Sequence, residues 1–177
     1  MKEVDEKEYS PGSKFNYNNF DTIVLGLIVD KASKTKFPNY FQQKIWSQIG
    51  AEASGGWIQN NLGETSSFQG FSAKPYDFIR LGLYVLDELN KSETCFGKYL
   101  NEATTTKISA SGPSSSYGYQ IWTNCGGKAD FCFIGYGGQK LIFNKEKKIV
   151  LYQHSTYEAW NTQRASKVVS AIYEGMK

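Results

Sequence analysis

The sequence predicts an α+β fold in which helices pack against an antiparallel sheet. Apolar residues recur at helical spacing in the first half of the chain, and from Tyr117 onward they alternate with a period of two. The charged segment 144–148, Asn-Lys-Glu-Lys-Lys, separates two extended apolar stretches as a hairpin turn does. We therefore expect a single domain over residues 1–177, mostly helical over 1–116, with antiparallel strands and a terminal helix over 117–177.

Three helices are expected before the strands. The first runs from about Thr22 to Ser33 with Asp21 as its N-cap, the second opens at Pro38 and ends at Gly50, and the third runs from Pro75 to about Leu89. Asp77 and Arg80 of the third helix are expected to be a helix N-terminal charge and a surface cation. The residues expected to face the core are Phe41, Ile45, Trp46 and Ile49 in the second helix and Phe78, Ile79, Leu83 and Leu86 in the third.

Two loops separate the remaining elements. Residues 53–74 are expected to form a structured loop, because the aromatic side chains of Trp57, Phe68 and Phe71 need something to pack on. Residues 104–116 are expected to form a polar surface loop. The expected strands are Tyr117–Trp122, Phe131–Ile134, Gln139–Phe143 and Ile149–Gln153, and a helix is expected from Glu158 to Tyr173.

Composition excludes several classes of protein. Apolar residues make up 40% of the chain, which favours a folded core over disorder. The net charge of +3 comes from charges spread along the chain without dense Lys/Arg blocks, so nucleic-acid binding is not expected. The longest apolar run, Ile23 to Val29, is far shorter than the roughly 20 residues that cross a bilayer, so no membrane span is expected. With His154 as its only histidine, the chain is expected to hold neither a metal nor a cofactor.

The cysteines and the first residues bear on the cellular compartment. Cys95, Cys125 and Cys132 are odd in number and lack CxxC spacing, so we predict plain thiols, with a Cys125–Cys132 bridge left open for an exported protein. Residues 1–8 are charged and lack the apolar stretch of a signal peptide, which says nothing about export if the chain begins within a longer protein. Both a periplasmic and a cytoplasmic location stay open.

Two polar segments are candidates for a functional site. Residues 15–19, Phe-Asn-Tyr-Asn-Asn, fit a loop that caps the following helix when they are taken alone. Residues 135–139, Gly-Tyr-Gly-Gly-Gln, are not a phosphate-binding loop, because no Lys-Ser/Thr follows and no helix opens after them. Glycines within a strand pattern do mark a place where the backbone approaches another group closely.

The order of these segments resembles the β-lactamase-like, penicillin-binding serine hydrolases. Residues 11–19, a Pro-Gly lead-in followed by Tyr17 and Asn19, are similar to that family's Tyr-x-Asn motif. Residues 76–83 are similar to the helix that follows its substrate loop, and residues 117–122, 133–139 and 149–151 to its terminal strands. Among its branches the chain looks most like the esterases and aminohexanoate-oligomer hydrolases allied to class C β-lactamases, where Gly-x-x-Gly-Gln replaces Lys-Thr-Gly. The resemblance covers about Ser10 to Lys177 and implies the C-terminal half of a β-lactamase/transpeptidase-like fold.

The resemblance also implies roles for individual residues. Tyr17 would exchange a proton with the nucleophile and the leaving group, and Asn19 would hydrogen-bond the substrate amide or a lysine. The backbone N–H of Tyr136 would be one of two oxyanion-hole donors. The substrate would contact Gly135, Gly137, Gly138, Gln139 and Trp57; for Trp57, as for Trp122 and Tyr119, packing in the core fits equally well.

One motif of the family is missing from this chain. The Ser-x-x-Lys motif lies well upstream of Tyr-x-Asn, but only 16 residues precede Tyr17, and the one local match, Ser33 to Lys36, lies downstream at a polar helix end. Covalent catalysis needs a nucleophile within reach of its base. The chain is therefore predicted to be a portion of a hydrolase that forms acyl-enzymes with an ester or amide, inactive by itself. Gly137, where many relatives carry His or Thr, does not favour penicillin as the substrate.

Two other interpretations stay open, and the partners follow from the first one. The chain can also be a degenerate, non-catalytic module that holds a ligand or partner, or an unrelated α+β binding domain. In the family's fold the sheet is built from both chain ends, so a C-terminal half would leave an unpaired strand edge. The expected partners are the N-terminal half of the same enzyme, a second copy paired through that edge, and a small ester or amide substrate.

Overall fold

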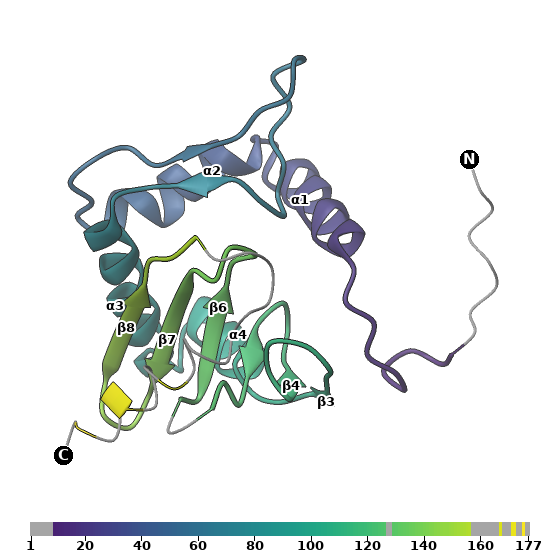
Figure 1. Cartoon of the computed structure of the whole chain (residues 1–177). Coiled ribbons are helices and arrows are strands. Elements are labelled where there is room, and N and C mark those ends of the chain that lie inside the picture. Colours follow the sequence, from purple (N-terminus) through teal and green to yellow (C-terminus); the bar gives the residue numbers. More distant parts are fainter. Residues whose placement is uncertain (1–8, 127–128, 157–166, 168–170, 173–174, 176–177) are drawn as a thin grey trace.

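The computed structural model describes residues 9–126 and 129–156 and the single residues 167, 171, 172 and 175, so the expected helix from Glu158 to Tyr173 lies outside the described elements. The chain forms helices first and a sheet afterwards (Figure 1). The helices are α1 (Asn19–Ser33), α2 (Phe37–Lys44), the 3-10 helix η1 (Trp46–Gln48), α3 (Pro75–Asn90) and α4 (Cys95–Ala103). The strands are β1 (Gly56–Trp57), β2 (Phe71–Ser72), β3 (Ile108–Ser109), β4 (Ser116–Tyr117), β5 (Trp122–Thr123), β6 (Phe131–Ile134), β7 (Lys140–Asn144) and β8 (Ile149–Gln153).

The main sheet is an antiparallel meander in the order β3-β4-β5-β6-β7-β8, and β1 pairs only with β2. Its longest ladder joins β7 to β8, from Lys140 opposite Gln153 to Asn144 opposite Ile149. The charged turn at 144–148 closes this hairpin, as expected from the sequence, with Lys148 in the left-handed region at φ 53°. Among the described strands β8 has a neighbour on one side only.

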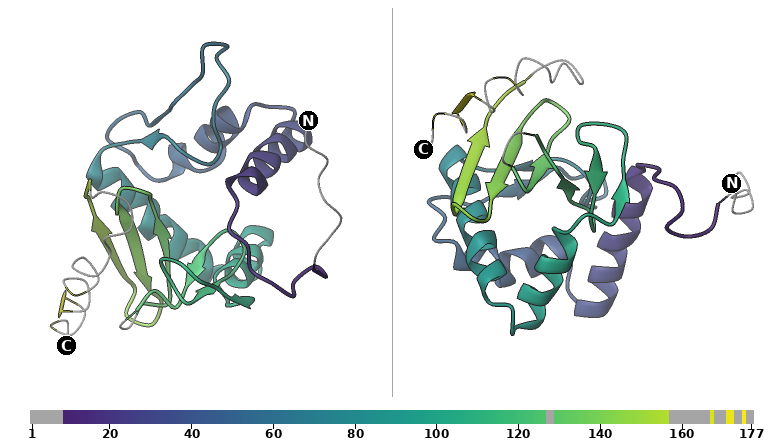
Figure 2. Two further views of the ribbon diagram at one scale, coloured as in Figure 1. Left: turned by 45° about the vertical axis from the view of Figure 1, so that its right-hand side comes forward. Right: turned by 90° about the horizontal axis from the view of Figure 1, so that it is seen from below.

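Alternate residues of the strands feed two apolar clusters on opposite faces of the sheet. One face of the sheet packs on α3 and α4 (Figure 2). On this face Phe131 and Phe143 are fully buried and stacked with ring centroids 4.3 Å apart. The other face gathers Trp122, Cys132 and Ile142. The core of this face therefore lies between α3, α4 and the strands. This arrangement confirms the expected α+β layout.

A separate aromatic cluster holds α2, η1 and the β1–β2 hairpin together. Trp57 and Phe71 lie with ring centroids 4.3 Å apart, and Phe41 and Trp46 pack on them at 5.0 and 5.2 Å respectively. The indole N–H of Trp46 donates to the carbonyl of Ala53 at 3.1 Å. Residues 53–74 are thus a structured loop, as expected, and their aromatic side chains supply its contacts.

The helix boundaries differ from the expected ones at their beginnings and ends. α1 begins at Asn19, because the side chain of Asn18, not Asp21, accepts the Phe20 N–H at 2.9 Å as the N-cap. The second helix ends at Lys44 and continues as η1, and Gly50 follows it in the left-handed region at φ 65°. In α3, Leu83 faces solvent instead of the core, and Val85 and Leu89 are buried in its place.

Residues 95–122 were predicted least well. The helix α4 was not expected, although Thr94 provides its N-cap by accepting the Gly97 N–H at 3.0 Å. The expected surface loop 104–116 contains β3 and part of β4, so the sheet begins before residue 117. The expected single strand Tyr117–Trp122 is instead a tight turn between β4 and β5, with Gln120 at φ 57°.

Asp77 and Arg80 of α3 belong to a hydrogen-bonded network in which Asp77 is buried and Arg80 is partly exposed. The Asp77 side chain is fully buried, and its Oδ1 accepts the Glu52 N–H and a guanidinium N–H of Arg80, both at 2.9 Å. Arg80 also pairs with Glu52 at 2.9 Å. Asp77 is a charge in the first turn of α3, as expected, but its burial was not expected: the loop after η1 folds over the start of α3, and the Glu52 N–H finds its acceptor there.

Asp77 makes the stability of the fold dependent on pH. Burial alone raises the pKa of this carboxyl, but hydrogen bonds from Glu52, Arg80 and Ala53 outweigh burial and leave the pKa below its usual value. A carboxyl with a lowered folded-state pKa contributes stability above its unfolded pKa of about 3.9 and loses it as the pH falls through the folded value. We expect the free energy of unfolding to decline below about pH 4 more steeply in the wild type than in Asp77→Asn, measured by urea denaturation between pH 7 and pH 3. Parallel declines would contradict this role; Asp87→Asn, at an exposed position of α3, is the control.

Cys125 and Cys132 form a disulfide, so the prediction of plain thiols is wrong for these two, while Cys95 is a free, exposed thiol. In the pairing of β5 with β6, Trp122 lies opposite Cys132, and Cys125, just beyond the end of β5, lies close enough to Cys132 to bond with it. A contact between paired strands has no CxxC spacing in the sequence, so the bridge was not predicted. The bridge spans 7 positions of the sequence.

Reduction of this disulfide should destabilise the protein. Closing so short a loop restricts the unfolded chain by about 2–3 kcal/mol at room temperature, so the free energy of unfolding should fall by that amount in a reducing buffer. Thiol titration of the denatured, unreduced protein should find one reactive group, that of Cys95. Cys95→Ser should leave the effect of reductant unchanged, and finding three reactive thiols in protein purified without reductant would refute the bridge.

Helix α1 is the least covered element. None of its residues is buried, and several of its apolar side chains are exposed: Phe20, Val24, Leu25, Leu27, Ile28 and Val29.

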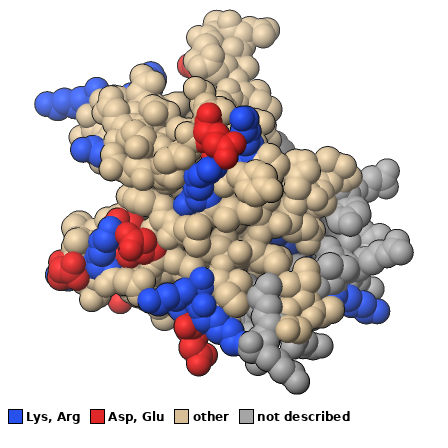
Figure 3. Space-filling view, turned by 90° about the vertical axis from the view of Figure 1, so that its left-hand side faces the viewer, with Lys and Arg blue, Asp and Glu red and all other residues tan. Residues whose placement is uncertain are grey.

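No helix in the described part of the chain is long and apolar enough to cross a membrane. On the face in Figure 3 the basic and acidic side chains lie beside one another, not in a patch of one sign.

Candidate active site

The loop that carries Tyr17 lies against the sheet at β4 and β5. The ring of Tyr17 stacks on Trp122 with centroids 5.5 Å apart, and it meets Tyr117 edge-on at 6.2 Å. Phe15 packs on the same two residues at 5.7 and 5.1 Å. Because Asn18 caps α1 directly after Tyr17, the chain changes direction there, and Asn19 becomes the first residue of the helix.

Tyr17 and Tyr117 differ in their exposure to solvent. The side chain of Tyr17 is half exposed, at 51%, while Tyr117 is partly buried beneath it. Burial, followed by the proximity of Tyr17 and Asp21, raises the pKa of Tyr117 above its ordinary value. The phenol of Tyr117 is consequently protonated at neutral pH and can donate a hydrogen bond.

The glycine segment 135–139 is a tight turn between β6 and β7. Gly138 N–H donates to the Gly135 carbonyl at 3.1 Å, and Gly135 N–H donates to the Gln139 carbonyl at 2.8 Å. The Gln139 side chain folds back over the turn, so a Cβ on Gly135 would lie 2.5 Å from its Oε1 and a Cβ on Gly137 2.7 Å from its Nε2. Gly138 has φ 84°, a conformation that favours glycine. The backbone therefore requires glycine at Gly138, whereas at Gly135 and Gly137 a side chain would first have to displace the Gln139 carboxamide.

The end of β8 anchors this turn from the side. The Gln153 carboxamide donates to the Gly138 carbonyl at 2.9 Å, and the Ser155 hydroxyl donates to the Gly137 carbonyl at 3.3 Å. These bonds restrict the peptide units that follow Gly137 and Gly138, while the bond from the Gly138 N–H to the Gly135 carbonyl restricts the unit that carries the Tyr136 N–H. The Tyr136 side chain is 74% exposed and stands clear of the core.

The two candidate segments are attached to neighbouring strands. Tyr17 packs on Trp122 of β5, and Trp122 lies opposite Cys132 of the next strand, β6. Tyr136 follows Cys132 by four residues, in the turn at the end of β6. The roles that the family resemblance implies for Tyr17 and the Tyr136 N–H require both groups to face one cleft, and this stays a prediction. Trp57 lies within the aromatic cluster of α2, η1 and the β1–β2 hairpin, and Trp122 is buried in the second core cluster.

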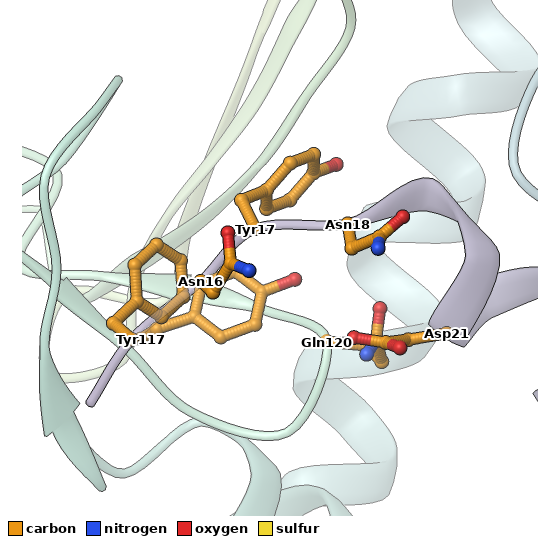
Figure 4. Close-up of a pocket in the computed structure, with 7 residues that line it drawn as sticks. Asn16, Tyr17, Asn18, Asp21, Tyr117 and Gln120 are labelled. Atoms are coloured by element: carbon orange, nitrogen blue, oxygen red, sulfur yellow. The ribbon is translucent and has the colours of Figure 1, made fainter. Parts of the chain in front are cut away.

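A pocket beside Tyr17 brings together residues that were not predicted as site residues. It lies between the N-terminal end of α1 and the β4–β5 turn (Figure 4). Gln120, at the tip of that turn, accepts a hydrogen bond from Thr22 at 3.0 Å, although 98 positions separate the two in sequence. No local pattern signals such a contact, since it depends on how the turn meets the helix. The residues that line the pocket are Phe15, Asn16, Tyr17, Asn18, Asp21, Tyr117 and Gln120.

The described residues contain no cluster of three or more His, Cys, Asp or Glu side chains that could hold a metal ion. Polar groups near Tyr17 are amides, phenols and one carboxylate. The chemistry that this set supports is hydrogen bonding and proton transfer.

A sequence model of the Beta-lactamase family matches residues 5–170, nearly the whole chain and both candidate segments. The chain belongs to the Beta-lactamase family. No curated protein is similar enough in sequence to count as a match. The family membership agrees with the resemblance that the Tyr17 segment and the glycine turn suggested.

Solved structures show that the Beta-lactamase-family chain has the expected fold. It is similar to a Bacillus anthracis protein described as a 6-aminohexanoate-dimer hydrolase, with TM-score 0.78 and 23% identity over 96% of this chain and 45% of that one. A β-lactamase from Mycobacterium bovis matches with TM-score 0.72 and 15% identity over 94% and 66%. A class C β-lactamase mutant matches with TM-score 0.63 and 13% identity over 98% and 61%. The chain thus spans less than half of the first of these structures and about two thirds or less of the others.

Proposed function

We propose that this chain is the C-terminal portion of a Beta-lactamase-family serine hydrolase that cleaves an ester or amide bond through an acyl-enzyme, with the Ser-x-x-Lys nucleophile on polypeptide outside this sequence. The observation that carries the proposal is the extent of the match. The family model covers residues 5–170, while the chain covers only 45% of the B. anthracis structure. A fold portion of this size, with a Tyr-x-Asn segment and no serine nucleophile upstream of it, fits the second half of such an enzyme.

Tyr17 is the proposed proton-transfer residue. In the phenolate form it takes the proton of the serine Oγ as that oxygen attacks the substrate carbonyl, and it gives the proton to the leaving alcohol or amine. Water then attacks the acyl-serine carbonyl and gives a proton to Tyr17, the ester bond breaks, the departing serine Oγ takes that proton from Tyr17, and the acid product leaves. An ordinary tyrosine pKa of about 10 requires a nearby cation for this task, and the lysine of Ser-x-x-Lys is the proposed source.

The remaining roles are proposed for Asn19, for the glycine turn and for Trp57. Asn19, exposed in the first turn of α1, is proposed to hydrogen-bond the substrate amide or that lysine. The Tyr136 N–H is proposed as one oxyanion-hole donor, supported by the anchoring of its turn through Gln153 and Ser155. Substrate contacts are proposed at Gly135, Gly137, Gly138 and Gln139, and at Trp57.

Reconstitution tests the proposal. This chain alone should not hydrolyse p-nitrophenyl esters above the buffer rate, because it lacks the nucleophile. Joining it, in cis or in trans, to an upstream-encoded segment that carries Ser-x-x-Lys should restore hydrolysis and allow labelling by a fluorophosphonate or penicillin probe. The matched control replaces the serine of that segment by alanine.

Two outcomes would reject the enzyme interpretation. One is a folded, reconstituted protein that neither hydrolyses the ester nor reacts with either probe. The other is the absence of any Ser-x-x-Lys segment from the coding sequence upstream in every frame, which would favour a non-catalytic binding module instead.

A further inference from the structure

Helix α1 turns its polar side inward and its apolar side outward. On the covered side the Ser67 hydroxyl donates to the Thr22 carbonyl at 2.9 Å, and a Cβ on Gly26 would lie 2.6 Å from the Ser67 side chain. Asp30, one turn further along, accepts the Phe37 N–H at 2.6 Å. Thr22, Gly26 and Asp30 are four residues apart and so mark one side of the helix, which lies against residue 67 and the start of α2.

The open side of α1 carries an apolar row, which we call the outer row. Four side chains stand there at i, i+4, i+7 and i+8, the spacing of the stripe that a helix normally turns toward a core. They are Phe20, Val24, Leu27 and Ile28, and they are 64%, 37%, 62% and 55% exposed. Figures 1 and 2 show α1 at the margin of the molecule, away from β6, β7 and β8. Single exposed apolar residues are ordinary, but a row over two turns indicates a surface that another polypeptide covers.

Two observations indicate what covers the outer row. The row begins three residues after Tyr17, so a body that brings a nucleophile to the Tyr17 hydroxyl lies beside it. In addition, 96% of this chain matches only 45% of the B. anthracis structure, so more than half of that fold corresponds to polypeptide outside this sequence. From Phe20 to Ile28 the row rises about 12 Å, which is the contact length of one crossing helix.

A membrane surface and a second copy of this chain fit the outer row less well. Lys31 is the single cation of α1, which therefore lacks the basic side of a helix that lies on lipid. A second copy would cover the row but would bring no Ser-x-x-Lys segment to Tyr17, the group next to it. The other portion of the enzyme satisfies both requirements.

We propose that the outer row of α1 is the surface on which the polypeptide that carries Ser-x-x-Lys packs, through the apolar side of a helix. This contact rests on the proposed function for the identity of its occupant. Because only two residues separate Tyr17 from Phe20, the contact holds the serine-bearing portion next to the proposed proton-transfer residue. The contact itself involves no chemical step, so it can be measured apart from hydrolysis.

The test is the accessibility of a thiol placed in the outer row. In this chain alone, residue 27 of Leu27→Cys should react with N-ethylmaleimide at a rate similar to that of residue 146 of Glu146→Cys, an exposed position in the β7–β8 turn. In the joined protein of the reconstitution experiment, labelling at residue 27 should slow by at least about tenfold, because it then requires local opening of the contact. Labelling at residue 146 should not change. Peptide mass spectrometry reads each position separately from Cys95, the native free thiol.

A second reporter and the hydrolysis assay separate the possible outcomes. Ile28→Cys should be protected in the same way if Leu27→Cys prevents the joined protein from folding. Hydrolysis by a joined protein whose outer row stays as reactive as in this chain would overturn the contact and leave the hydrolase proposal in place. Protection of the row in a joined protein that neither hydrolyses the ester nor reacts with the probes would support the contact and reject the hydrolase. Protection in this chain alone that increases with protein concentration would assign the row to a second copy and overturn the proposal.

Discussion

In the reconstituted enzyme, Tyr17→Phe should reduce kcat for a p-nitrophenyl ester by about 10²- to 10⁴-fold, the contribution of a positioned proton-transfer group. KM should change little, because the lost hydroxyl acts on protons instead of holding the substrate. The phenylalanine ring keeps the stacking on Trp122 at 5.5 Å and the edge contact with Tyr117, so the fold should be retained. Steady-state kinetics, with circular dichroism to confirm folding, measure both effects.

A second tyrosine separates this role from a general effect of removing a phenol. Tyr40 lies in α2 and is also partly exposed, and Tyr40→Phe should leave kcat within about twofold of the wild type. If Tyr17→Phe retained full activity, the proton-transfer assignment would be wrong. A loss of activity in both variants would point to a shared defect in folding.

Gly118→Ala should be the most destabilising single-methyl change in the sheet region. A Cβ at this position would overlap the backbone carbonyl of Ala103 and lie 3.0 Å from that of Thr105. Ala103 is fully buried at the end of α4 and accepts the Tyr119 N–H at 3.1 Å, so neither backbone can move away without losing that bond. We expect a loss of about 3 kcal/mol in the free energy of unfolding and a fall in Tm of roughly 6–12 °C.

Gly56→Ala is the matched control for this substitution. No atom lies within 4 Å of a Cβ built on Gly56, so the change should alter the free energy of unfolding by less than about 1 kcal/mol. Thermal and urea denaturation of both variants make the comparison. Equal stabilities of Gly118→Ala and Gly56→Ala would show that the turn between β4 and β5 does not pack against α4 as described.

Elements with a regular apolar period could be predicted from the sequence. α3 follows Pro75 and the β6–β8 strands alternate cleanly, and the charged segment 144–148 marks their hairpin. In contrast, α4 contains Gly97, whose close approach to the backbone at Glu88 depends on how α3 and α4 meet. The turn at Gln120 was missed because a left-handed glutamine carries no local signal.

The candidate site was predictable only where motifs are contiguous. The Tyr17 segment and the glycine turn are short contiguous stretches, so each can be recognised in the sequence from its own residues. Their setting was not predictable, since Trp122 and Tyr117 reach Tyr17 only through the pairing of β4 with β5. The burial of Asp77 likewise depends on a contact with Glu52, 25 positions away.

If the proposed roles hold, the anchoring of the glycine turn by β8 would link assembly to catalysis. Gln153 and Ser155, which hold the carbonyls of Gly138 and Gly137, stand at and just beyond the end of a strand whose outer side has no described neighbour. A polypeptide that adds a strand along β8 would therefore brace the hydrogen-bond donors of the proposed oxyanion hole at the same time as it extends the sheet. Association with that polypeptide would then increase the ability of the turn to polarise a substrate carbonyl, and dissociation would decrease it. This coupling would not require the nucleophile.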